Sequence, residues 1–269
     1  MASLSISTAW NETAEFVKRE GGALFIIALA FMALPSVALQ ALAPGAVAPG
    51  QAPEPRLWVV LLLPVVMVLS IVGSLAISAL ALGRENIVGN AIAHGFRRFL
   101  PLLGASLLVG LAVVIVLVPL ILASGIDMSE LAAPTPAVAG KLLLFMVIFA
   151  LIVLFVWVRI MLVTPVAAAE KLGPVAIIRR SWALTRGHIW KLVALVLLLA
   201  IAVLVIGYVV SLVVGIPVAL IDGPPRPGSL GALLILLAGG VVNAGFAVIF
   251  TTMVARIYAQ LIAGETTGN

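Results

Sequence analysis

The fold is decided by residues 192–221, which read LVALVLLLAIAVLVIGYVVSLVVGIPVALI and include no charged side chain. A bilayer core of about 30 Å is crossed by roughly 20 helical residues. In lipid, backbone N–H and C=O groups must be paired inside the protein, and a helix pairs them within one segment. This stretch therefore predicts a membrane-spanning helix.

Five further uncharged runs predict five further spans, at residues 22–53, 57–83, 99–126, 142–158 and 227–255. The run at 142–158 is short, but it continues past Arg159 into another apolar stretch. Prolines between residues 44 and 55 place the segment after Ala43 in a loop. We therefore expect an all-α membrane protein with six transmembrane helices, in a single membrane domain over residues 1–269.

The composition agrees with this class. Hydrophobic residues make up 64% of the 269 residues and charged residues 9%, against about 45–50% and about 25% in soluble domains. These figures exclude a soluble enzyme, a disordered tail and a nucleic-acid-binding domain. The net charge is +5, which we attribute to topology and anionic lipid rather than to nucleic acid. The chain has no cysteine, which excludes disulfides and Cys-based metal sites.

Lysine and arginine concentrate on one side of the predicted spans. With a cytoplasmic N-terminus, the outer side holds only Arg56, Lys141 and Arg226 of the 15 basic residues. The others then face the cytoplasm, as the positive-inside rule requires. We therefore expect a multi-pass protein of the bacterial cytoplasmic membrane with both termini in the cytoplasm.

Three segments share one design: an amphipathic stretch with basic residues, a span leading out, a loop and a span leading back. Their bounds are 1–82, 83–170 and 171–269. The last two end alike, with Val158-Arg159-Ile160 and Ala255-Arg256-Ile257, and a glutamate follows each, Glu170 or Glu265. Two interpretations stay open. The pattern is a threefold duplication of a helical hairpin, or basic residues simply recur on one side of any series of membrane hairpins.

Each unit begins with a stretch that predicts an amphipathic helix at the cytoplasmic face, and the third is the clearest. Gly173 and Pro174 fit a helix start, and Gly187 fits a left-handed cap at the helix end. A stripe of apolar residues is expected to face the lipid, formed by Val175, Ile178, Trp182 and Ile189.

Basic residues around this third helix are candidates for a site that binds a phospholipid headgroup. Each basic residue near an anionic surface contributes about 1 kcal/mol. The alternative is that they only control topology and anchor the helix. The candidates are Arg159, Arg179, Arg180, Arg186 and Lys191.

Arg159 interrupts an apolar region, and two readings of it stay open. In the first, it marks the inner end of the fourth span and extends to the interface. In the second, the helix continues and Arg159 faces a polar cavity, paired with Glu170 or bound to an anionic headgroup.

Small residues in the second and sixth spans predict close helix packing within the chain. Gly240 and Ala244 have a small-xxx-small spacing, and Gly73 lies on a similar small face of the second span. Asn243 is expected to donate a hydrogen bond across such an interface. Tyr258, near a span end, fits the aromatic belt at the headgroup level.

Residues 158–190 carry a pattern that resembles the glycerophosphoryl diester phosphodiesterase membrane domain and related uncharacterised bacterial inner-membrane proteins. Its residues are Val158, Arg159, Pro165, Glu170, Gly173, Pro174, Arg180, Ser181, Trp182, Leu184, Thr185, Arg186, Gly187 and Trp190. In some members of that family the domain is fused to a soluble phosphodiesterase barrel, for which this chain has no room. The resemblance therefore implies a membrane domain without the catalytic part, and for the stand-alone form it implies no settled activity.

We expect no catalytic site, no metal site and no cofactor. His94 and His188 lie among arginines and supply too few metal ligands. Every acidic residue lies outside the six uncharged runs, which argues against a carboxylate relay in the membrane. The preferred interpretation is a non-enzymatic membrane protein that engages phospholipids, preferentially anionic ones, or supports a membrane or lipid-enzyme partner. The alternative is a transporter or channel for a lipid or small solute.

Overall fold

A computed structural model describes residues 4–42, 57–124, 135–223, 226 and 228–267, and the ordered segments among them are helices. The all-α class is therefore confirmed, and these residues form no strand. The predicted loop after Ala43 lies outside them. The helices are α1 (Ile6–Ala28), the π-helical η1 (Leu29–Ala33), α2 (Leu34–Leu42), α3 (Leu57–Ala81), α4 (Val88–Ser124), α5 (Pro136–Ile160), α6 (Val163–Ala169), α7 (Pro174–Thr185), α8 (Ile189–Asp222) and α9 (Leu230–Thr267).

Six helical segments of the described chain are long and apolar enough to cross a membrane, as predicted. They cover Ile6–Leu42, Leu57–Ala81, Val88–Leu122, Val138–Ala169, Ile189–Ile221 and Leu230–Glu265. Large apolar side chains are exposed along them, for example Leu122, Leu220 and Ile221. Such a surface is stable in lipid rather than in water. The chain is a multi-pass integral membrane protein.

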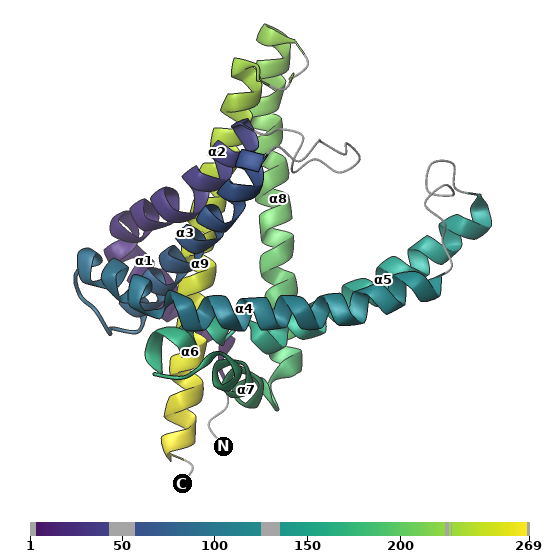
Figure 1. Ribbon diagram of the computed structural model, residues 1–269. Coiled ribbons are helices and arrows are strands. Elements are labelled where there is room, and N and C mark those ends of the chain that lie inside the picture. The colour runs from purple at the N-terminus through teal and green to yellow at the C-terminus, as the bar shows by residue number, and fades with distance from the viewer. Residues whose placement is uncertain (1–3, 43–56, 125–134, 224–225, 227, 268–269) are drawn as a thin grey trace.

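The six segments are arranged as three pairs that diverge from a common base. Figure 1 shows α8 and α9 running side by side, whereas α4 and α5 extend away across that direction. Helices α2 and α3 pack against α9. The short helices α6 and α7 lie at the base, where α6 contacts α3, α4 and α9, and α7 contacts α4 and α5. The threefold relation between the repeat units stays a prediction.

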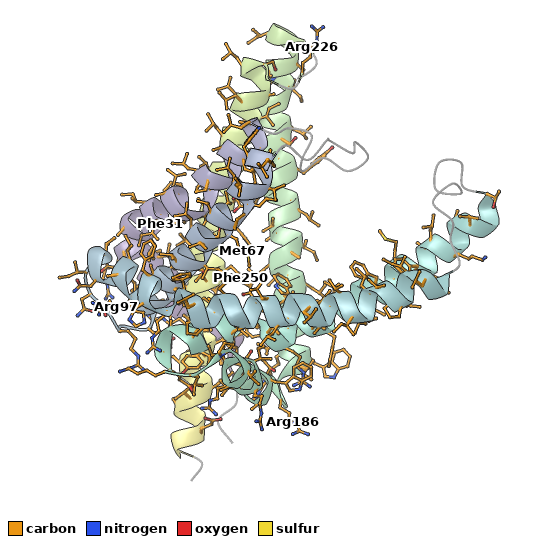
Figure 2. All side chains as sticks on the ribbon, in the orientation of Figure 1. Phe31, Met67, Arg97, Arg186, Arg226 and Phe250 are labelled. Carbon is orange, nitrogen blue, oxygen red and sulfur yellow. The ribbon has the colours of Figure 1, made fainter. Side chains whose placement is uncertain are left out.

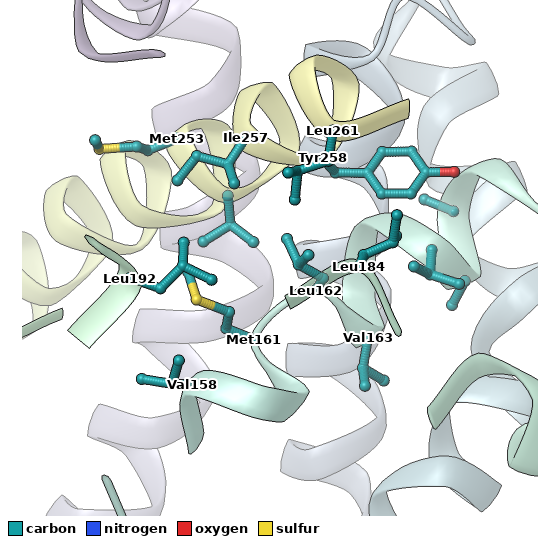
Figure 3. Close-up of a cluster of buried hydrophobic side chains, with 14 of the residues drawn as sticks. Val158, Met161, Leu162, Val163, Leu184, Leu192, Met253, Ile257, Tyr258 and Leu261 are labelled. Carbon is teal, nitrogen blue, oxygen red and sulfur yellow. The ribbon is translucent and has the colours of Figure 1, made fainter. Parts of the chain in front are cut away.

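The main apolar core forms at this base. Its members come from the end of α5, from α6 and α7, from the start of α8 and from the last part of α9, as Figure 3 shows. Leu162, Leu192 and Ile257 are fully buried in it. Residues of α1, α3 and α4 also belong to this core, for example Ala9, Leu75 and Leu102. Because side chains from eight helices pack together here, the base holds α7 in place.

The small residues of the second and sixth spans pack within the chain, as predicted. A Cβ atom built on Gly240 of α9 would lie 2.7 Å from Val37 Cγ2 of α2. A Cβ atom built on Gly73 of α3 would lie 2.8 Å from Phe31 Cβ of η1. Both glycines therefore allow close contact with the first span. The side chain of Asn243, by contrast, makes no hydrogen bond within the described part of the chain, and its expected bond across the interface is not formed there.

The three predicted amphipathic stretches differ in structure. The first two run without a break into the spans α1 and α4, and only the third, α7, is a separate helix. Gly187 explains the difference, because its φ of 91° turns the chain between α7 and α8. Pro101 sits inside α4 without ending it.

Candidate functional site

Helix α7 presents one face to the protein and another to its surroundings. Gly173 is the N-cap in an extended conformation, Pro174 follows in the first turn, and Arg186 is the C-cap. Within α7 the buried side chains are Ile177, Ser181, Leu184 and Thr185. The predicted apolar stripe lies elsewhere on the helix: Val175 and Trp182 are exposed and Ile178 is half-buried. Ile189, the fourth predicted member, begins α8 instead, and both Ile178 and Ile189 pack against the main core. Only Val175 and Trp182 of the predicted stripe are exposed and free to contact lipid.

Two hydroxyl groups on the buried face of α7, those of Ser181 and Thr185, form hydrogen bonds with Arg159 of α5. Ser181 Oγ donates a hydrogen bond of 2.7 Å to the carbonyl oxygen of Arg159. Thr185 Oγ1 donates to the carbonyl oxygen of either Ser181 or Trp182 and accepts from Arg159 Nη1 at 3.5 Å. Buried hydroxyls without such partners would each cost about 1–3 kcal/mol.

Arg159 is buried beneath α7, with 8% of its surface exposed. Its Nη1 also donates to the carbonyl oxygen of Trp182 at 3.3 Å. The guanidinium carbon lies 4.8 Å from the centre of the Trp182 ring and 5.3 Å from that of Phe155, within the range of cation–π attraction.

Each reading of Arg159 from the sequence matches this position only in part. Helix α5 ends at Ile160, beside Arg159, as the first reading expects, but the Arg159 side chain is buried beneath Trp182. No ion pair joins it to Glu170 or to another carboxylate of the described residues. Arg159 holds α7 on α5.

Arg180 joins α7 to the ends of two other elements. Its Nη2 lies 2.6 Å from Glu265 Oε2 near the end of α9, and its Nε lies 3.3 Å from Glu170 Oε1, just after α6. Tyr258 of α9 donates a hydrogen bond of 2.7 Å to the same Glu170 oxygen. The hydrogen bond to Glu265 is the main cause that raises the pKa of the Arg180 guanidinium above its ordinary value. We call Arg180, Glu170, Glu265 and Tyr258 the Arg180 cluster.

The five predicted headgroup residues thus separate into two groups. Arg159 and Arg180 are engaged as described, and Lys191 Nζ donates to the carbonyl oxygen of Leu4 at 3.0 Å. Arg179 and Arg186 are exposed, and within the described residues their side chains form no hydrogen bond or ion pair. Figure 2 shows Arg186 at the base of the molecule. Of the five predicted headgroup residues, only Arg179 and Arg186 therefore have guanidinium groups without an internal partner among the described residues.

An apolar groove of about 410 Å³ runs between α4 and α5 and reaches α7. Leu108, Val116 and Leu120 line it from α4, while Phe149 and Val156 line it from α5. At the α7 end its lining includes Ile178 and Trp182, two members of the predicted stripe. Arg179 lies three residues before Trp182 and Arg186 four residues after it, which places both beside Trp182 on the helix surface.

The remaining residues of the pattern at 158–190 mostly shape the chain or pack inside it. Pro165 is buried in α6, Gly187 turns the chain, and Trp190 at the start of α8 is 84% exposed. His94 Nε2 lies 2.9 Å from the carbonyl oxygen of Ala168, and its Nδ1 lies 3.7 Å from Glu85 Oε1. No group of three His, Asp or Glu residues suited to a metal ion occurs in the part of the chain that the structure describes.

Sequence reasoning missed the Arg180 cluster as a unit. The parallel glutamates after Val158-Arg159-Ile160 and Ala255-Arg256-Ile257 were the available signal, because both of them bind Arg180. Tyr258 was interpreted as a belt residue, but its hydroxyl group is directed at Glu170.

The fold and this site define a helical, multi-pass membrane protein that carries the Arg180 cluster of charged residues at its base. The chain belongs to the family described as Domain of unknown function (DUF7847), whose sequence model matches residues 4–261. Searches of curated proteins and of solved structures found no match to the chain.

Proposed function

We propose that this protein is a non-enzymatic membrane protein that binds anionic phospholipid at α7. The observation that carries the proposal is that Trp182 lines the α7 end of the apolar groove between α4 and α5. Two exposed arginines, Arg179 and Arg186, flank Trp182 in sequence at helical spacing. A phospholipid has the same two parts in the same order, an anionic headgroup and an apolar chain. Trp182 lies between them, where an amphipathic ring is favoured.

The charges account for a preference for anionic lipid. Each arginine near an anionic surface contributes about 1 kcal/mol, so the pair contributes about 2 kcal/mol. That corresponds to roughly a 30-fold difference in affinity. Arg180 does not add to this preference, because Glu170 and Glu265 balance its charge.

The test measures the association of spin-labelled phosphatidylglycerol and phosphatidylcholine with the full-length protein in bilayers. In the double variant Arg179→Gln/Arg186→Gln, we expect the preference for phosphatidylglycerol to fall by up to about 30-fold. The matched control is Lys141→Gln/Arg226→Gln, which removes the same charge from two exposed residues away from α7. An equal loss in both double variants, or no loss in either, contradicts the proposal.

The proposal includes the orientation of the chain across the membrane. With α7 at the inner face, the basic residues around it face the cytoplasm, and both termini lie on that side of a bacterial cytoplasmic membrane. The resemblance to the phosphodiesterase membrane domain supports a role beside lipid metabolism. A lipid enzyme or another membrane protein is the expected partner.

One cavity favours transport as a second candidate function. A space of about 220 Å³ between α8 and α9 is lined by Ser211 and Asn243 among apolar residues. Polar groups in a membrane cavity are typical of a solute path. Because the chain has no cysteine, single cysteines at Ala202 and Asn243 can be labelled cleanly with a charged thiol reagent. The accessory role predicts protection at both positions, and rapid labelling at both would favour transport instead.

A further inference from the structure

A second cavity, of about 410 Å³, lies between α1, α9 and the segment that connects α3 with α4. Its lining differs from that of the α4–α5 groove because it carries charges of both signs. Arg19, Glu20, Glu85 and Arg256 line it together with Asn86, and Leu24, Leu80 and Leu82 provide apolar walls. No residue of α7 lines this cavity.

Two of the four charges in this cavity satisfy each other. Arg19 Nε lies 3.3 Å from Glu20 Oε1, and both side chains are largely exposed, at 69% and 49%. The guanidinium group of Arg19 also lies over the ring of Phe16, at 5.8 Å from its centre. This pair therefore lies toward solvent and leaves Arg256 and Glu85 as the charges that a ligand can address.

Arg256 is the inner cation of the cavity. Its guanidinium carbon lies 5.0 Å from the centre of the Phe16 ring, on which Arg19 also stacks. Its Nε is buried and has no hydrogen-bond partner within the described residues. A buried N–H donor on a charged group is costly when it is left unpaired. Arg256 is therefore the candidate anion ligand of this cavity.

Glu85 supplies the opposite charge nearer to the surface. Its side chain is 29% exposed, its Oε1 lies 3.7 Å from His94 Nδ1, and no ion pair within the described residues joins it to Arg256. A ligand that satisfies both residues must carry an anionic group and a cationic group that are separated in space.

We propose that this cavity binds a phosphoethanolamine group, with its phosphate on Arg256 and its ammonium group on Glu85. Guanidinium groups bind phosphate through several N–H donors at once, and a primary ammonium group donates hydrogen bonds to a carboxylate. The apolar walls at Leu24, Leu80 and Leu82 suit the apolar part of a lipid beyond the phosphate. The lining thus offers a cation, a carboxylate and apolar walls, the three kinds of partner that an amine-bearing phospholipid requires.

The first test measures binding of soluble O-phosphoethanolamine to the full-length protein in a maltoside detergent, by calorimetry. We expect at least tenfold tighter binding than that of inorganic phosphate or of phosphocholine, whose quaternary nitrogen has no N–H to donate. Arg256→Gln should weaken binding of phosphoethanolamine at least tenfold. Glu85→Gln should remove the preference over phosphocholine.

Controls separate binding from folding. Arg226→Gln and Glu15→Gln each remove one exposed charge that does not line the cavity, and both should bind like the unmodified protein. Should Arg256→Gln fail to fold, Glu85→Gln still decides the matter, because Glu85 is in a partly exposed connecting segment. Equal binding of phosphoethanolamine and phosphate, or unchanged selectivity in Glu85→Gln, overturns the proposal.

A second experiment, with lipids, shows whether the phosphoethanolamine group belongs to a phospholipid or to a free ligand. The protein is placed in nanodiscs that contain phosphatidylethanolamine and phosphatidylcholine, and the lipids that stay bound are identified by native mass spectrometry. Retention of phosphatidylethanolamine that is lost in Arg256→Gln and Glu85→Gln supports a lipid headgroup. Binding of soluble phosphoethanolamine without lipid retention supports a free ligand of the same chemistry. Neither outcome depends on Arg179 or Arg186, so this proposal can fail while the proposed function stands.

Discussion

Replacing Arg180 by glutamate should lower the free energy of unfolding by about 2–3 kcal/mol. The change removes the cation that Glu170 and Glu265 share and adds a third carboxylate beside them. Breaking a fully buried ion pair costs about 3–5 kcal/mol. We expect less here, because the Arg180 side chain is 31% exposed and that of Glu265 is 49% exposed. The loss can be measured from thermal unfolding in detergent, followed by tryptophan fluorescence.

The neighbouring arginine provides the control for this change. Arg179→Glu makes the same charge reversal on the same helix, but Arg179 is exposed and forms no ion pair with a described residue. Its effect should stay within about 0.5 kcal/mol. The double variant Arg180→Glu/Glu265→Arg should recover part of the loss, because one pair of opposite charges is restored. An Arg180→Glu variant as stable as Arg179→Glu would show that the cluster does not stabilise the fold.

Replacing Gly95 by leucine should lower the free energy of unfolding by about 3 kcal/mol. Gly95 is a buried residue of α4, and a Cβ atom built there would lie 2.7 Å from the carbonyl oxygen of Val72 in α3. A backbone atom cannot turn away as a side chain can, so α3 and α4 must separate. Overpacking of this kind typically costs about 1–3 kcal/mol. Chemical or thermal unfolding of the purified protein would measure the loss.

Gly110 on the same helix is the matched control. It is exposed, and no atom lies within 4 Å of a Cβ atom built on it. Gly110→Leu should therefore leave stability unchanged or raise it by up to about 1 kcal/mol, because glycine is a poor helix former. Equal losses at Gly95 and Gly110 would show that the contact with Val72 is not the cause.

The spans could be predicted from the sequence because their signal is additive: many apolar residues in one run. The break between α5 and α6 was harder to predict, since it falls inside an apolar stretch at Met161 and Leu162. Pro165 was the available clue. It lies in the first turn of α6, where its missing N–H costs nothing, whereas in a continuous helix it would clash with the preceding turn.

The candidate site was predicted in composition but not in detail. The sequence shows which residues are basic, but not which of them have an internal partner. Arg179 and Arg180 are neighbours of the same type, and only the fold decides that Arg180 meets Glu170 and Glu265. The same holds for α7, whose buried face carries Ser181 and Thr185 because α5 offers Arg159 to bind them. Contacts between distant segments have no periodic pattern to reveal them.

The Arg180 cluster also has a consequence for the order in which the chain is assembled. Arg180 leaves the ribosome before α8 and α9 are made, and at that stage Glu170 is the carboxylate available to it. Glu265 and Tyr258 arrive only with the last part of α9. The cluster is therefore completed only once the last part of α9 has been made, and it then links α9 to α7 and to the end of α6.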